Sequence, residues 1–97
     1  MTGEQAKQAF KSQVRVVHNC RGSGSLIVYH RIKDYTYEIR SDRKLYLVLG
    51  LTDEKERCLV YADPRDVAIY DENKELTYDN YFKNSRQLPQ RVNESEV

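Results

Sequence analysis

The chain has 97 residues, enough for one hydrophobic core but not for two, since typical domains run to about 100–150 residues. Charged residues make up 32% of it, and no apolar run approaches the roughly 20 residues needed to cross a bilayer. Residues 1–5 hold neither a basic stretch nor an apolar one, so no signal peptide is expected. We therefore predict a cytoplasmic protein without membrane contact, in which the two cysteines, Cys20 and Cys58, remain thiols.

The net charge of +1 conceals an asymmetry along the chain, because residues 1–44 carry +5 and residues 45–97 carry −4. Such polarity can steer or orient a charged partner. The same charges can also interleave once strands pair, because sequence halves need not be spatial halves. Both interpretations stay open at this level.

A short helix is predicted at the start of the chain. Thr2 followed by Gln5 is a capping-box pattern, and Ala6, Ala9 and Phe10 then fall at helical spacing. We expect an amphipathic helix over residues 3–12 that packs Phe10 onto a sheet.

Strands are predicted where apolar and polar side chains alternate between turn signals. The expected strands cover residues 14–20, 25–32, 35–40, 45–51, 57–62 and 67–70. Turns with glycine, aspartate or proline separate several of them, and Pro64 suits the second position of a tight turn. Residues 76–82 form a last ordered piece, and residues 85–97 are predicted to be a polar, mobile tail after a single domain over residues 1–84.

The hairpin over residues 35–51 is the clearest signal in the chain. Tyr35, Tyr37 and Ile39 share one parity, so they are expected to face the core together. Residues 45–51 are apolar on both parities, which predicts a central strand. The fold class is therefore mainly β: a short N-terminal helix, then a five- or six-stranded antiparallel SH3/Sm-like barrel or strongly bent sheet.

Two short motifs accompany this order of elements: Gln8-Ala9-Phe10 in the opening helix and Leu45-Tyr46-Leu47 after the polar turn. Together they resemble the WYL domain, an SH3/Sm-like barrel of bacterial transcriptional regulators and defence-associated proteins, which has Trp-Tyr-Leu at the second position. The resemblance covers about residues 6–70 and implies a regulatory protein of a bacterium or phage. The family's arginine-bearing segment corresponds to residues 59–64, which lack arginine, so its ligand pocket is not carried over.

Metal binding and catalysis are not predicted. The nitrogen and sulfur ligands available are His18, Cys20, His30 and Cys58, without the spacing of paired zinc ligands. His18 and Cys20 continue the apolar face of their strand. Cys58 alternates with apolar residues, so we expect the Cys58 thiol to be buried and inert. The turn at residues 21–25 could cradle a phosphate, but it lacks the lysine and following helix of a phosphate-binding loop. We predict a protein that is not an enzyme and holds no cofactor.

Two kinds of partner remain. Tyrosine and arginine are favoured anchors of protein interfaces, and residues 53–80 carry a net charge of −5 that could meet a basic partner. Our leading hypothesis is a binding and regulatory module that contacts a protein, and homo-oligomers are compatible with it. The alternative is RNA or single-stranded DNA, held by cations with a tyrosine stacked on the bases. The candidate ligand-binding residues are Tyr29, Arg31, Lys33, Arg40, Arg43, Lys44 and Tyr46.

Overall fold

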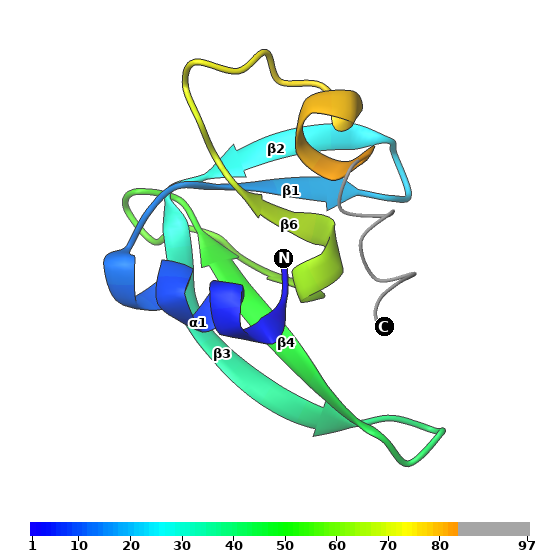
Figure 1. The fold of residues 1–97 in the computed structure, drawn as a ribbon. Helices are drawn as coiled ribbons and strands as arrows, with labels where there is room; N and C mark the ends of the chain where they lie inside the picture. The colour runs from blue at the N-terminus through cyan, green and yellow to red at the C-terminus, as the bar shows by residue number, and fades with distance from the viewer. Residues whose placement is uncertain (84–97) are drawn as a thin grey trace.

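The computed structural model describes residues 1–83. It contains one α-helix and six short strands, with two single turns of other helix types (Figure 1). In chain order these are α1 (Gly3–Ser12), β1 (Val16–Cys20), β2 (Ser25–Tyr29), β3 (Arg31–Ile39), β4 (Leu45–Thr52), β5 (Leu59–Ala62), η1 (Pro64–Asp66), β6 (Val67–Ile69) and η2 (Asp79–Lys83). The prediction of a mainly β fold with a short N-terminal helix is confirmed, whereas the end of the expected domain at residue 84 and the expected tail over 85–97 lie outside the described residues.

The strands form two separate antiparallel sheets of three strands each. Their orders are β2-β1-β6 and β3-β4-β5. Within residues 1–83 no strand pairing joins one sheet to the other, so the closed barrel, one of the two expected architectures, is not formed. The physical reason lies at His30, where the chain bends between β2 and β3, so that β2 pairs with β1 while β3 pairs with β4.

This bend also corrects the expected strand boundaries. The strand predicted over residues 25–32 ends at Tyr29, and β3 begins at Arg31. Lys33 and Asp34, expected to be a connection, belong to β3, where the pairing register shifts between Ile32 and Asp34. A bulge of this kind adds a residue to one strand without ending it, which alternation alone does not reveal.

The N-terminal helix forms as its capping pattern predicts. The Gln5 backbone N–H donates to Thr2 Oγ1 over 3.1 Å, and the Thr2 backbone N–H donates to Gln5 Oε1 over 2.8 Å. The helix ends at Gln13, whose backbone is left-handed with φ 55°. Its buried face consists of Ala6 and Ala9, small residues that let the helix approach the sheet closely.

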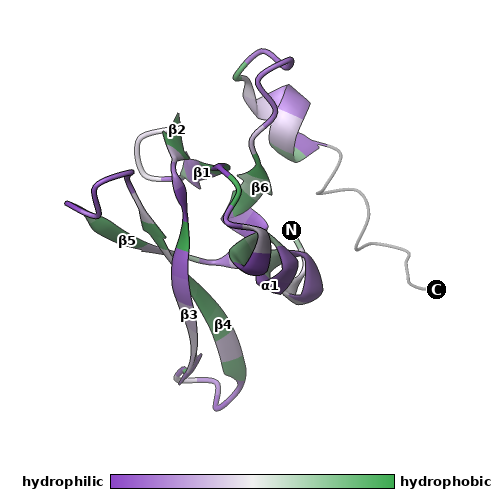
Figure 2. Ribbon diagram, turned by 90° about the vertical axis from the view of Figure 1, so that its left-hand side faces the viewer, coloured by the Kyte–Doolittle hydropathy of each residue, from purple (hydrophilic) through white to green (hydrophobic). Residues whose placement is uncertain are grey.

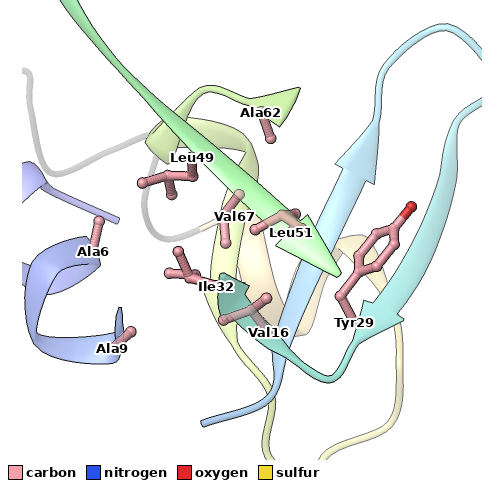
Figure 3. Close-up of a cluster of buried hydrophobic side chains, with 9 residues drawn as sticks. All are labelled: Ala6, Ala9, Val16, Tyr29, Ile32, Leu49, Leu51, Ala62 and Val67. Atoms are coloured by element: carbon pink, nitrogen blue, oxygen red, sulfur yellow. The ribbon is translucent and has the colours of Figure 1, made fainter. Parts of the chain in front are cut away.

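The main core lies between α1 and the two sheets (Figure 3). It combines residues from nearly every element: Ala6, Ala9, Val16, Tyr29, Ile32, Leu49, Leu51, Ala62 and Val67. A second cluster lies on the opposite face of β1, where Val17 meets Tyr81 and Phe82 of η2. Both faces of β1 are therefore covered.

The outer half of the β3–β4 hairpin extends beyond this core (Figure 1). Tyr35, Tyr37 and Ile39 are 37%, 47% and 73% exposed, so the expectation that they fill the core is wrong. The sheet β2-β1-β6 covers only the inner half, where Ile32 and Leu49 are fully buried. Figure 2 shows that hydrophobic residues nevertheless continue along β4 toward the tip of the hairpin.

Two smaller observations complete the fold. Cys58 is exposed rather than buried, because it lies in the connection before β5, and Cys20 is half-buried; both are free thiols. No helix within residues 1–83 is long and apolar enough to span a membrane.

Candidate functional site

The outer half of the β3–β4 hairpin carries an apolar surface that the elements within residues 1–83 cover only in part, because Leu47 packs against the main core while the tip is exposed. In the antiparallel register, Tyr37 lies opposite Leu47 and Ile39 lies opposite Leu45. We call these four residues the apolar hairpin face. Leu45 is 63% exposed, so the face ends at the tip in two large aliphatic side chains that remain open to solvent. Clustered apolar residues of this kind mark interaction surfaces more often than single exposed ones do.

Helix α1 borders the inner end of this face. The Phe10 ring meets the Tyr35 ring edge-on at 5.4 Å between centroids, and Tyr35 meets Tyr37 in the same way at 6.4 Å. Lys7 Nζ lies 5.6 Å from the centroid of the Tyr37 ring. Hydrogen bonding to the Tyr37 side chain raises the pKa of Lys7. The tyrosines are thus held in fixed orientations beside a cation.

The other face of the hairpin is polar and is organised by Arg40. Its Nε donates to Glu38 Oε1 over 2.8 Å, and its second amino group donates to Asp63 Oδ1, also over 2.8 Å. The guanidinium lies over the Tyr46 ring, 4.3 Å from its centroid. These hydrogen bonds to Asp63 and Glu38 raise the pKa of Arg40. The hairpin is therefore tied to the residue that follows β5.

The turn of the hairpin is closed by Asp42. Its carboxylate accepts hydrogen bonds from the Tyr46 hydroxyl and from the Lys44 backbone N–H. The bond from Tyr46 is the main cause that lowers the pKa of Asp42, and the same bond raises the pKa of Tyr46. Arg43 completes the turn in a left-handed backbone conformation with φ 64°.

An open groove of about 460 Å³ lies on this polar face. Its lining comes from β3, β4, β5 and the residue after β5: Thr36, Glu38, Arg40, Val48, Tyr61, Ala62 and Asp63. The charged groups in it are already paired with one another through Arg40. The groove thus offers the exposed Tyr61 ring rather than an unpaired charge.

Arg31 and Lys33 lie at the opposite end of β3 from the turn. Both pair with Glu56, Lys33 Nζ at 3.1 Å from its Oε1 and Arg31 at its other oxygen. The hydrogen bond from Lys33 is the main cause that lowers the pKa of Glu56. This carboxylate partly neutralises two of the cations that the sequence suggested for ligand binding.

Tyr29 belongs to the core rather than to a surface. It is 9% exposed, and burial is the main cause that raises the pKa of its hydroxyl. Its ring lies 6.2 Å from the His18 ring, measured between centroids. A ring in this position offers little surface for a base to stack on. Its place among the candidates rests on the strand parity that it shares with the exposed Ile27.

The structure brings four of the seven candidates together at the tip of the hairpin: Arg40, Arg43, Lys44 and Tyr46. Among residues 1–83, the side chains of Arg43 and Lys44 have no carboxylate within ion-pair distance. Sequence reasoning missed Ile39 and Leu45 as surface residues. The expected strands, over residues 35–40 and 67–70, did not show this, because the nine-residue length of β3 against three residues in β6 became visible only in the structure.

The residues considered for metal binding do not form a metal-ligating group in the described part of the chain. Cys20 Sγ lies 3.5 Å from His18 Nδ1, and Asp66 accepts a hydrogen bond from Arg21 Nε over 2.7 Å. No three side chains of His, Cys, Asp or Glu converge among residues 1–83.

Comparison of the chain with protein-family models, with curated proteins and with solved structures finds no match.

Proposed function

We propose that this protein is a non-enzymatic binding and regulatory module that contacts a protein partner through the apolar hairpin face. The observation that carries the proposal is the pair Ile39 and Leu45, directly opposed in register and 73% and 63% exposed. Burying apolar surface contributes about 25 cal/mol per Å², so covering these side chains favours association. A regulatory role in a bacterium or phage, in the cytoplasm, agrees with the resemblance to the WYL domain and stays part of the proposal.

The rigidity of the hairpin supports the proposal. Arg40 joins Glu38 to Asp63, and Asp42 closes the turn with the Tyr46 hydroxyl. A surface that is already held in one conformation loses less conformational entropy on binding. The polar side of the hairpin thus acts as a support for its apolar side.

The charges around the face suggest the chemistry of the partner. Lys7 lies over the tyrosines at the inner end, and Arg43 and Lys44 lie at the turn. Opposite charge across an interface accelerates encounter and fixes orientation. The partner that fits best is a protein segment with apolar side chains flanked by carboxylates.

Nucleic acid is the second candidate and is less well supported. Arg31, Lys33 and Arg40 already hold carboxylates. Phosphate binding would require these ion pairs to open or to be shared, which reduces its gain. Binding to a nucleic acid is therefore tested beside binding to a protein in the experiment below.

The experiment uses a partner that co-purifies with the protein from its native cells and is then prepared pure. Calorimetry compares the original chain with the double variant Ile39→Ser, Leu45→Ser. We expect the variant to bind at least about tenfold more weakly, because the residues at the centre of an interface dominate affinity. The matched control is Ile27→Ser, Ile69→Ser, which changes two exposed isoleucines of the other sheet, 42% and 50% exposed.

Equal binding by the face variant and the original chain would contradict the proposal. The nucleic-acid alternative is tested by titrating a labelled oligonucleotide at two salt concentrations. Salt-sensitive binding that survives the face variant but is lost in Arg43→Ala, Lys44→Ala would replace a protein partner by a nucleic acid.

A further inference from the structure

The outer edge of β3 is a long strand edge without a partner in the described chain. In the sheet β3-β4-β5, β3 pairs with β4 on one side only. It has nine residues, and those from Lys33 to Ile39 are all exposed. An open edge presents a row of backbone donors and acceptors that can add another strand.

The pairing with β4 shows which backbone groups point outward. The Arg40 backbone N–H donates to the Lys44 carbonyl over 3.2 Å, in the same register that places Glu38 opposite Tyr46 and Thr36 opposite Val48. In an antiparallel pair, residues alternate between bonding to the partner strand and pointing away from it. The N–H and C=O groups of Tyr35, Tyr37 and Ile39 therefore point toward the open edge.

We propose that β3 pairs antiparallel with β3 of a second copy of this chain, about a two-fold axis at Tyr37. Tyr37 then lies opposite Tyr37 of the second copy, and Tyr35 lies opposite its Ile39. All three residues direct their free backbone groups at the new partner, which allows about six hydrogen bonds between the chains. Two three-stranded sheets become one sheet that crosses the dimer.

Side-chain charge selects this register over its neighbours. With Tyr37 on the axis, Asp34 lies opposite Arg40 of the second copy, and Thr36 lies opposite Glu38. Moving the axis to Thr36 places Asp34 opposite Glu38, and moving it to Glu38 leaves Asp34 beside the turn of the second copy, without Arg40 opposite it. Like charges directly opposed in a sheet are destabilising. Shifts by one residue are excluded because they would set the apolar face of one copy against the polar face of the other.

The charge pattern also favours a second copy over an unrelated strand, because the edge is complementary to itself when reversed. The proposal goes beyond the binding function, since it uses the edge of β3 rather than the apolar hairpin face. Dimerisation leaves Leu45 and Leu47 of both copies on one continuous sheet face. A dimer would thus present two copies of that face side by side.

The first test is the mass of the full chain in solution. Sedimentation equilibrium over about 0.01–1 mM protein should show a rise from the 11.5 kDa monomer toward twice that mass. The variant Tyr37→Pro should stay a monomer, because proline removes a backbone N–H that points to the edge and is tolerated on edge strands. A mass of 11.5 kDa at every concentration would overturn the proposal.

The second test reads the register directly by cross-linking. Residues in a hydrogen-bonded antiparallel pair have Cα atoms about 5.5 Å apart, within the range that a disulfide spans. In a chain carrying Cys20→Ser and Cys58→Ser, Tyr37→Cys should form a disulfide dimer under mild oxidation. The matched control is Tyr35→Cys, on the same face and similarly exposed, which lies opposite Ile39 and should cross-link at least about tenfold more slowly. Equal rates for the two variants would show random collision and overturn the register.

The third test exchanges charges between copies. Asp34→Arg alone and Arg40→Glu alone each place like charges opposite one another, so each variant should be monomeric. Mixing the two variants restores both opposite-charge pairs in a heterodimer, so the mass should rise again. Circular dichroism of each variant checks that it is folded. If folded variants fail to associate on mixing while the original chain dimerises, the Asp34–Arg40 pairing is wrong and the proposal falls.

Discussion

At the scale of single residues, Arg40 has a role different from the one its charge suggests. The sequence presents it as a cation available for a ligand, whereas in the single chain its guanidinium already pairs with two carboxylates while the side chain stays 35% exposed. It binds Glu38 of β3 and Asp63 beyond β5, and it covers the Tyr46 ring. Arg40 therefore holds the hairpin in place, and its exposed part remains able to meet a further carboxylate such as Asp34 of a second copy.

The hydrogen bond between Tyr46 and Asp42 leads to a prediction about pH. Because the hydroxyl stabilises the carboxylate, the pKa of Asp42 is lowered in the folded state. A lowered folded pKa adds stability above the unfolded pKa of about 3.9, and this stability is lost as the pH falls through the folded value. Tyr46→Phe should therefore raise the pKa of Asp42, measured by carbon NMR of its carboxyl group, and should destabilise the protein at neutral pH more than in acid.

The control for this substitution is Tyr61→Phe, which removes the hydroxyl of an exposed tyrosine on β5. The pKa of Asp42 should not respond to it. An unchanged Asp42 titration in Tyr46→Phe would show that the hydrogen bond is absent in solution.

At the scale of elements, the hairpin shows what alternation can and cannot predict. The alternation of Tyr35, Tyr37 and Ile39 correctly indicated a strand and the face they share. It could not indicate that the face runs past the end of the core, because burial depends on the elements that pack opposite. The helix was easier to predict, since Thr2 and Gln5 form their capping bonds within one turn and need no distant partner.

This difference predicts how the two halves of the hairpin respond to substitution. Ile39→Ser and Leu45→Ser together should change the free energy of unfolding by less than about 1 kcal/mol, because both side chains are mostly exposed. Leu49→Ala, on the same face but fully buried, should cost about 2–5 kcal/mol through lost contacts and a cavity. Urea unfolding of both variants measures the contrast. Similar losses for the two would mean that the outer half of the hairpin is covered in solution.

At the scale of the whole molecule, two cores lie on opposite sides of β1. Val16 faces the main core, and Val17 faces the cluster with Tyr81 and Phe82. Five or six strands were expected from the sequence and residues 1–83 form six, but the division into two sheets was not expected. That division depends on the bend at His30 and on pairings between distant strands, such as β1 with β6, which local patterns do not encode.

The second core predicts that η2 contributes to the stability of the entire domain. Phe82 is 3% exposed and stacks on Tyr78, with 5.9 Å between ring centroids. Phe82→Ala should lower the free energy of unfolding by about 3–5 kcal/mol, a large part of the total for a small domain. Leu76→Ala, at a position 41% exposed in the segment before η2, should cost less than about 1 kcal/mol. Thermal or urea unfolding measures both variants. Equal losses of unfolding free energy in the two would show that the cluster does not form.

The backbone conformation of Arg43, at the tip of the hairpin, lowers the stability of the turn while the side chain adds a positive charge there. Arg43 occupies a left-handed conformation that glycine would adopt with less strain, by about 1 kcal/mol. Glycine there would make an easier turn, but it would remove one of two tip cations that have no carboxylate partner within residues 1–83. Arg43 therefore combines a conformational cost with a positive charge at the outermost point of the sheet. Replacing Arg43 by glycine would give a more stable hairpin that attracts an acidic partner less strongly.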